Sequence, residues 1–157
     1  MEIRKFQDSD IRQIVRLFYE TVHSVNKKDY TQEQIEAWAS REDEEQRLES
    51  WKCSMSSNLT FVALIDGIIV GFSDMTQEGY LDRLFVHKDY QRQGIASSLV
   101  RALESEASRL GITQLNTQAS ITAKSFFEHH GYQLVASQCV ERKGVHLVNF
   151  KMIKNLQ

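Results

Sequence analysis

The chain has 157 residues, of which 41% are hydrophobic and 25% are charged, and its formal net charge is −2. These values fit a single soluble globular domain over residues 1–157. The small negative charge excludes the basic footprint of a nucleic-acid-binding protein, and no apolar run reaches the roughly 20 residues that span a bilayer. The two cysteines, Cys53 and Cys139, are far apart, which predicts no disulfide framework and favours a reducing cytoplasm.

The first third of the chain is predicted to hold one strand followed by helices. Hydrophobic residues recur every three or four positions from Ile11 to Val25, which predicts a helix that Asp8 caps. Thr31 and Gln34 form the capping-box pattern of a second, short helix. In chain order, the expected elements are a strand at 2–6, a helix from 8 to 25, a polar break at 26–29, a helix from 31 through 38 and a further helix around 48–55.

From residue 59 onward the pattern becomes that of strands joined by short turns. Asp66-Gly67 is a strong two-residue hairpin signal between two β-rich runs. In chain order, the expected elements are strands at 59–65, 68–75 and 80–86, a helix at 95–110, a strand at 113–119, a helix at 122–130, a strand at 132–140, a turn at 142–144 and a strand at 145–153. This order predicts an α+β fold, with a mostly antiparallel mixed sheet and helices on both faces. Strands 80–86 and 113–119 should run parallel, because a helix crosses over between them.

A short polar loop, Gln91-x-x-Gly94-x-Ala96, joins the strand at 80–86 to an amphipathic helix. Small residues there let backbone N–H groups approach a ligand closely, and a helix N-terminus favours anionic groups. The alternative is an ordinary core helix with a tight entry turn. The arrangement suits a pyrophosphate, and it resembles the acetyl-CoA signature of the GNAT family of N-acetyltransferases.

A second stretch strengthens this resemblance. The pattern A-x-x-F-F-x-x-x-G-Y at residues 123–132 resembles the family's A-x-x-L-Y-x-x-x-G-F motif. The predicted order of elements also matches the GNAT fold over nearly the whole chain. Within the family, the N-terminal pattern that contains His23, Tyr30, Gln34 and Trp38 resembles the YafP-like branch of bacterial acetyltransferases.

The resemblance implies that strands 80–86 and 113–119 splay apart and hold acetyl-CoA, the acetyl donor, in the gap between them. Strand backbone would pair with the pantetheine arm, and one N–H group would polarise the acetyl carbonyl. The residues that the resemblance assigns to acetyl-CoA are Leu84, Phe85, Val86, Gln91, Arg92, Gln93, Gly94, Ile95, Ala96, Ser97, Ser120 and Phe126.

Three positions depart from the family pattern. Lys88 stands where a proline is often found after the valine of the preceding strand, a change that affects the rigidity of the loop only. Ser120 stands where an asparagine commonly contacts the pantetheine arm, so the polar contact with that arm is expected to be weaker. Phe127 stands where a tyrosine often protonates the departing CoA thiolate. Tyr132, Tyr90 or water would then have to supply that proton, unless the thiolate leaves without specific help.

Asp82 is the first candidate for the general base that an amine acceptor needs. An amine that resembles lysine has a pKa near 10.4, so only about one molecule in a thousand is neutral at pH 7. Strand alternation puts Asp82 on the same face as Tyr80, Leu84 and Val86, beside the expected thioester. The alternative role of this carboxylate is an ion pair with a neighbouring arginine.

Other candidates come from segments that wall the acceptor pocket in the family. His23 would bind substrate or relay a proton, and the more common alternative is a structural hydrogen bond. Tyr30 and Trp38 are candidate pocket residues that also fit as core residues, and Asn149 lies on the final hairpin. The adjacent histidines at 129–130 point about 100° apart on a helix, so no metal cofactor is expected.

The sequence therefore predicts a cytoplasmic N-acetyltransferase that moves an acetyl group from acetyl-CoA to a primary amine. No nucleophile motif is present, which agrees with direct attack in a ternary complex. The rival interpretation is a non-catalytic acyl-CoA-binding sensor or partner module, which Phe127 makes plausible, and a weaker one is a nucleotide-phosphate binder. The sequence does not select the acceptor, and it leaves a homodimer open.

Overall fold

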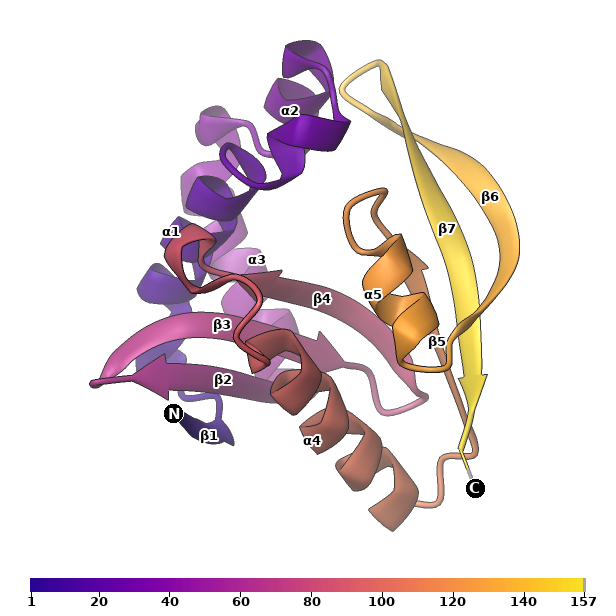
Figure 1. The fold of residues 1–157 in the computed structure, drawn as a ribbon. Coiled ribbons are helices and arrows are strands. Elements are labelled where there is room, and N and C mark those ends of the chain that lie inside the picture. Colours follow the sequence, from indigo (N-terminus) through magenta and orange to yellow (C-terminus); the bar gives the residue numbers. More distant parts are fainter. Residues whose placement is uncertain (157) are drawn as a thin grey trace.

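The computed structural model describes residues 1–156, whose strands form one seven-stranded sheet in the order β1-β2-β3-β4-β5-β7-β6 (Figure 1). All neighbouring strands are antiparallel except β4 and β5, which are parallel. The strands are β1 (Glu2–Lys5), β2 (Leu59–Ile65), β3 (Ile68–Met75), β4 (Tyr80–Val86), β5 (Gln114–Ala119), β6 (Gln133–Arg142) and β7 (Val145–Asn155). The predicted α+β class and the parallel pair are confirmed.

The helices cover both faces of this sheet (Figure 1). They are α1 (Ile11–Val22), α2 (Gln32–Trp38), α3 (Glu44–Ser57), α4 (Ile95–Arg109) and α5 (Lys124–His129), and short 3₁₀ turns lie at Asp8–Asp10, Asn26–Asp29, Arg41–Asp43 and Lys88–Tyr90. Helix α1 packs on β3 and β4 from one side, and α4 packs on β2, β3 and β4 from the other. Within residues 1–156, no helix is long and apolar enough to cross a membrane.

The start of the first helix differs from the prediction that Asp8 caps it. Residues 8–10 form a 3₁₀ turn, and the carboxylate of Asp10 accepts the Gln7 N–H at 2.8 Å. The same carboxylate accepts both Arg4 guanidinium nitrogens, at 2.8 and 2.9 Å. Because Asp10 is buried, it needs these donors, and they fix the turn that precedes α1. The helix also ends at Val22, before the predicted Val25.

Most local signals in the sequence match the structure. The Thr31 hydroxyl accepts the Gln34 N–H at 3.1 Å, and the Gln34 side chain accepts the Thr31 N–H at 2.9 Å, as a capping box requires. Asp66 and Gly67 have φ values of 52° and 78°, which suits a two-residue hairpin turn. Several boundaries differ by a few residues: for example, α5 begins at Lys124, two residues after the prediction, and β6 continues to Arg142, so that the predicted turn is shorter.

A β-bulge interrupts β4 at Asp82. Asp74 of β3 pairs with Arg83, and the next β3 residue, Met75, pairs with Leu81, so Asp82 is an extra residue on β4. Leu81 and Leu84 therefore pack in the same hydrophobic cluster, although their spacing would put them on opposite faces of a regular strand. The prediction that alternation groups Asp82 with Tyr80, Leu84 and Val86 is wrong, because the bulge resets the alternation.

The parallel strands β4 and β5 pair at two positions only and then separate. Tyr80 is opposite Asn116, and Leu81 is opposite Thr117, after which no further pair forms. The Thr117 hydroxyl donates to the Leu81 carbonyl at 2.8 Å, at the last point of contact. The predicted splay of these strands is present, and it begins where the bulge redirects β4.

Gly79 holds the closed end of the splayed pair, and its replacement should be costly. Its carbonyl accepts the Asn116 N–H at 3.0 Å, its φ is +98°, and a Cβ there would lie 2.8 Å from the Gln114 carbonyl oxygen. We expect Gly79→Ala to lower the free energy of unfolding by about 2 to 4 kcal/mol in urea titrations, because left-handed strain and overpacking add.

The matched control is Gly67→Ala. Gly67 has a φ of +78° but no atom within 4 Å of an added Cβ, so only the backbone strain applies. That variant should lose about 1 kcal/mol. Equal losses in the two variants would show that the contact with β5 at Gly79 contributes nothing.

Candidate active site

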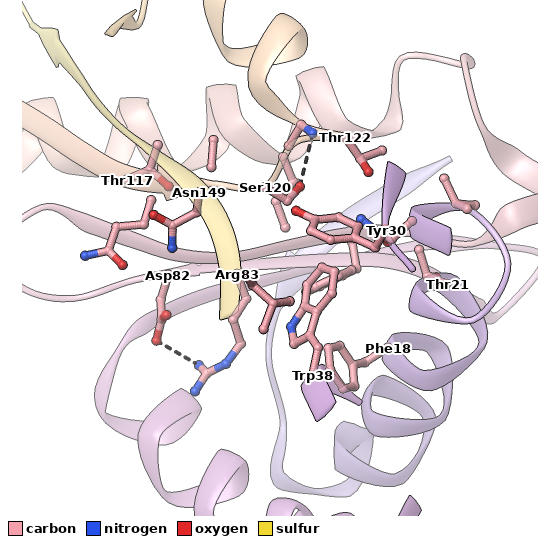
Figure 2. Close-up of a pocket in the computed structure, with 18 of the residues that line it drawn as sticks. Phe18, Thr21, Tyr30, Trp38, Asp82, Arg83, Thr117, Ser120, Thr122 and Asn149 are labelled. Carbon is pink, nitrogen blue, oxygen red and sulfur yellow. Dashed lines mark hydrogen bonds and ion pairs between the residues drawn. The ribbon is translucent and has the colours of Figure 1, made fainter. Parts of the chain in front are cut away.

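A cavity of about 570 Å³ opens where β4 and β5 separate (Figure 2). Its walls come from α1, α2, α3, β4, β5, the start of α5 and the β6–β7 hairpin. Figure 2 shows Asp82 and Arg83 together in one part of this cavity, and Tyr30 beside Ser120 in another. Segments far apart in the chain therefore meet at the gap in the sheet.

Backbone groups of β4 face this gap. The His87 N–H donates to the Val70 carbonyl of β3 at 2.8 Å. The backbone N–H and C=O groups of His87 and Phe85 therefore point toward β3. Backbone groups alternate in direction along an antiparallel ladder, so the N–H and C=O groups of Leu84 and Val86 point away from β3, toward the gap between β4 and β5. The Val86 carbonyl accepts the Gln91 side-chain amide at 2.6 Å. The N–H groups of Leu84 and Val86 are thus aimed at whatever occupies the cavity.

The glycine loop leads from this gap to the N-terminus of α4. Gly94 precedes the helix with a left-handed φ of +81°, and no atom lies within 4 Å of an added Cβ. Arg92 is also left-handed, with a φ of +61°, and Arg92, Gln93 and Gly94 are exposed. The fifteen-residue helix α4 directs its free N–H groups and its positive dipole end to this exposed loop.

The structure separates the predicted acetyl-CoA residues into two groups. Those that line the cavity are Leu84, Phe85, Val86, Gln91, Ala96, Ser120 and Phe126. Phe85 lines it with its side chain, because its backbone is paired with β3. Arg92, Gln93 and Gly94 lie outside the cavity, at its edge, and Ile95 is buried in the core. The Ser97 hydroxyl lies 3.0 Å from Nε2 of His130.

Asp82 lines the cavity, and its side chain is 35% exposed. One carboxylate oxygen lies 3.5 Å from the Arg83 guanidinium. That guanidinium has closer partners, since it also bonds the carboxylate of Asp74 and, at 3.0 Å, the hydroxyl of Ser54. Asp74 is completely buried, and burial raises its pKa against the opposing effect of Arg83. Arg83 is therefore primarily the ion-pair partner of Asp74. The carboxylate of Asp82 remains accessible from the cavity.

The three predicted acceptor residues, Tyr30, Trp38 and Asn149, all line the cavity. The Tyr30 hydroxyl accepts the Ile121 N–H at 2.8 Å, which ties the segment before α2 to the β5–α5 loop. The Tyr30 and Trp38 rings lie 5.3 Å apart. The Asn149 side-chain oxygen is buried and has no hydrogen-bond partner among the described residues.

His23 does not line the cavity. Its Nε2 lies 3.0 Å from the Ala39 carbonyl oxygen, and its ring stacks on that of Tyr19 with centroids 6.4 Å apart. This placement matches the structural alternative for His23, because the ring joins α1 to the end of α2 and does not line the cavity.

The tyrosines suggested as replacements for Phe127 also lie elsewhere. The Tyr132 hydroxyl donates to Glu104 at 2.9 Å, and burial, together with the Glu104 charge, raises its pKa strongly. Tyr90 packs on the ring of His87 at 5.6 Å and does not line the cavity. Tyr30 and Tyr80 do line it, and burial raises the pKa of both phenols, so each keeps its proton at neutral pH.

Two further cavity residues were missed by the sequence analysis. Arg47 reaches the cavity from α3, a helix whose sequence shows no clear apolar face. Asn26 is 5% exposed, and its side-chain oxygen has no partner among residues 1–156. It lies in a polar segment that resembles an ordinary loop. No local pattern distinguishes either residue from a solvent-facing one.

Comparison with known proteins decides the family. Residues 26–154 match the family model described as "Acetyltransferase (GNAT) domain". The chain belongs to the GNAT family of acetyltransferases. It is 36% identical over 152 residues to the uncharacterized N-acetyltransferase YafP of Escherichia coli K12, with 97% of this chain and 94% of YafP covered. The predicted family and its YafP-like branch are confirmed. The prediction that the protein is an acyltransferase is confirmed with them.

Solved GNAT structures share the fold over the full chain. A GCN5-related N-acetyltransferase from Rhodopseudomonas palustris superposes with a TM-score of 0.91 at 32% identity, covering 99% of this chain and 95% of that one. The PaiA N-acetyltransferase of Thermoplasma acidophilum, solved in complex with coenzyme A, superposes with a TM-score of 0.78 at 22% identity and covers 99% and 98%. The splayed β4–β5 pair thus belongs to a GNAT fold.

Gly94 should be required for coenzyme A binding but not for folding. Its left-handed backbone and the empty space around it leave room for a phosphate, which a branched side chain would fill. We expect Gly94→Val to abolish coenzyme A binding in calorimetry while the circular dichroism spectrum is retained.

Gly111 provides the matched control at the other end of α4. It has a φ of +79°, and no atom lies within 4 Å of an added Cβ, so Gly111→Val carries a similar backbone strain away from the loop. That variant should keep the affinity for coenzyme A. Unchanged affinity in Gly94→Val would contradict the assignment of this loop.

Proposed function

We propose that this GNAT protein transfers an acetyl group from acetyl-CoA to a primary amine by direct attack in a ternary complex. The observation that carries the proposal is the cavity between β4 and β5, toward which the N–H groups of Leu84 and Val86 point. A cavity of about 570 Å³ is within the size range of small-molecule sites. The same gap in the sheet offers both a free backbone edge and a pocket.

The residues present fit the donor. The free edge of β4 can pair with the amides of a pantetheine arm, as one strand pairs with another. The exposed loop at Arg92–Gly94 and the N-terminus of α4 suit a pyrophosphate, and the Arg92 guanidinium suits a charge-assisted phosphate contact. Acetyl-CoA supplies an activated thioester, and the N–H of Leu84 or Val86 would stabilise negative charge on its carbonyl oxygen.

Asp82 is the group that we assign to proton removal from the amine. Its carboxylate lines the cavity, it belongs to the bulge from which the gap opens, and Asp74 competes with it for Arg83. Asp82 would take the proton directly or through a water molecule. General-base assistance of this kind is typically worth about 10²- to 10⁴-fold in rate.

The departing thiolate needs a proton that Phe127 cannot give. Tyr30 and Tyr80 line the cavity, and each phenol is protonated at neutral pH, since its ordinary pKa is near 10 and burial raises the pKa further. We propose that one of these two replaces the family tyrosine. Tyr30 lies next to Ser120 and accepts the N–H of Ile121, which leaves its own hydroxyl proton free to be donated.

Turnover separates this function from that of a non-catalytic acyl-CoA-binding module. An enzyme releases free thiol from acetyl-CoA when a suitable amine is added, whereas a binding module retains acetyl-CoA without release. Thiol release above the background hydrolysis rate, dependent on both amine and protein, supports the proposal. Tight binding with no amine-dependent release across a broad amine panel would overturn it.

Asp82→Asn should lower the rate by about 10²-fold or more at neutral pH, as loss of a general base predicts. The affinity for coenzyme A should hardly change, because the carboxylate faces the cavity and not the phosphate loop. The defect should shrink as the pH rises toward the pKa of the amine, near 10.4 for a lysine-like acceptor, because free amine then becomes abundant. Initial rates measured across pH test this.

Asp66→Asn is the matched control for the loss of one carboxylate. Asp66 lies in the β2–β3 turn with a φ of 52°, a conformation that asparagine also tolerates. The Asp66→Asn variant should have the wild-type rate and pH profile. If Asp82→Asn behaves in the same way, Asp82 is only an ion-pair partner of Arg83.

A further inference from the structure

Arg47 brings a positive charge to the cavity, and the part of the chain that the structure describes gives it no negative partner. One terminal nitrogen donates to the Tyr19 hydroxyl at 2.6 Å, and the other donates to the Trp38 carbonyl at 3.3 Å. An arginine has five N–H donors, so three have no partner among residues 1–156. No carboxylate of the described chain lies within ion-pair distance of this guanidinium.

Aromatic rings hold this guanidinium in place. Its central carbon lies 4.9 Å from the centroid of the Phe18 ring, 5.3 Å from that of Tyr19 and 5.7 Å from that of Trp51. Such faces attract a cation and replace part of its lost hydration. They do not neutralise its charge, and a half-buried cation without a counter-ion is costly. The arrangement is therefore suited to an anion that arrives with a ligand.

The other cations of the cavity do not share this property. Arg83 bonds the buried carboxylate of Asp74 and contacts Asp82. Lys143 lies 3.4 Å from Asp43. Arg142 lacks an acidic partner among residues 1–156, but it is exposed on the hairpin and donates to the Glu141 carbonyl. Arg47 is thus the half-buried cation of this cavity that no carboxylate of residues 1–156 neutralises.

We propose that Arg47 binds a carboxylate of the acceptor, so that the acceptor is an amine that also carries a carboxylate. This inference rests on the proposed N-acetyltransferase function. Two observations assign the anion to the acceptor and not to acetyl-CoA. First, Arg47 contacts α1, which packs on the side of β4 opposite α4. Second, the loop proposed to bind the phosphates leads into α4, so Arg47 and this loop lie on opposite sides of β4.

The geometry also connects Arg47 with the proposed base. Both guanidinium groups contact the Trp51 ring: its centroid lies 5.7 Å from the central carbon of Arg47 and 4.6 Å from that of Arg83, which contacts Asp82. An acceptor that lies along this aromatic wall would place its carboxylate on Arg47 and its amine toward Asp82. The wall itself favours an apolar body between the two charged ends.

The test compares pairs of similar amines, one member of which carries a carboxylate and the other an uncharged group or hydrogen in its place. The probes are L-phenylalanine against L-phenylalaninamide, and 4-(aminomethyl)benzoate against benzylamine, which cover a short and a long spacing between amine and carboxylate. Thiol release from acetyl-CoA is measured with the full chain. In at least one pair, we expect the carboxylate to raise kcat/KM by roughly 10- to 100-fold, mostly through a lower KM, as a charge-assisted hydrogen bond predicts.

Variants attribute this preference to Arg47. Arg47→Met keeps the aliphatic stem and should abolish the preference while KM for acetyl-CoA stays the same, and Arg47→Lys should restore part of it. The matched control is Arg41→Met, because Arg41 stacks on the same Tyr19 ring at 4.8 Å but does not line the cavity. Arg41→Met should keep the full preference.

Each outcome has a distinct meaning. If wild-type protein acetylates the uncharged amines as well as their carboxylate partners, the anion site is wrong and the N-acetyltransferase function stands. A preference that survives in Arg47→Met also overturns the assignment. If no amine in any panel causes thiol release, the proposed function fails first, and the inference fails with it. The wild-type comparison requires no variant, so it holds even if Arg47→Met does not fold.

Discussion

The candidate site depends on one extra residue in β4. Asp82 has no partner of its own on β3, and the bulge that it forms changes which side of the strand each backbone group faces. Before it, Leu81 bonds β5; after it, Phe85 bonds β3, and Leu84 and Val86 face an open gap. The bulge lies next to the last β4–β5 pair, so the cavity, the free backbone edge and the exposed carboxylate lie together where β4 leaves β5.

Much of this fold could be predicted from the sequence because its signals are local. The capping box at Thr31–Gln34, the Asp66-Gly67 turn and the apolar face of α4 each act over a few residues. The prediction that the glycine loop between a strand and a helix binds the donor rests on a local signal of the same kind. The prediction failed where a second nearby residue could play the same role. Asp10, which is buried and bonded to Arg4, fixes the turn before α1 that Asp8 was expected to cap.

The remaining features depend on contacts between distant segments. The bulge is a property of the β3–β4 register, which no pattern within residues 80–86 determines, so the alternation argument for Asp82 used the wrong faces. Arg47 enters the cavity because α3 packs beside Phe18 of α1. Tyr80 and Tyr30 replace Tyr132 as candidate proton donors because Glu104 holds the Tyr132 hydroxyl inside the core. Only the folded chain sets these partners.

The most direct test of this account is residue-resolved amide hydrogen exchange with and without coenzyme A. The N–H groups of Leu84 and Val86 point toward the gap, whereas that of Phe85 is paired with β3. We expect coenzyme A to slow exchange at Leu84 and Val86 strongly and at Phe85 little, because only the first two gain a partner. Equal protection of all three, or no change at Leu84 and Val86, would contradict the claim that this free edge of β4 binds coenzyme A.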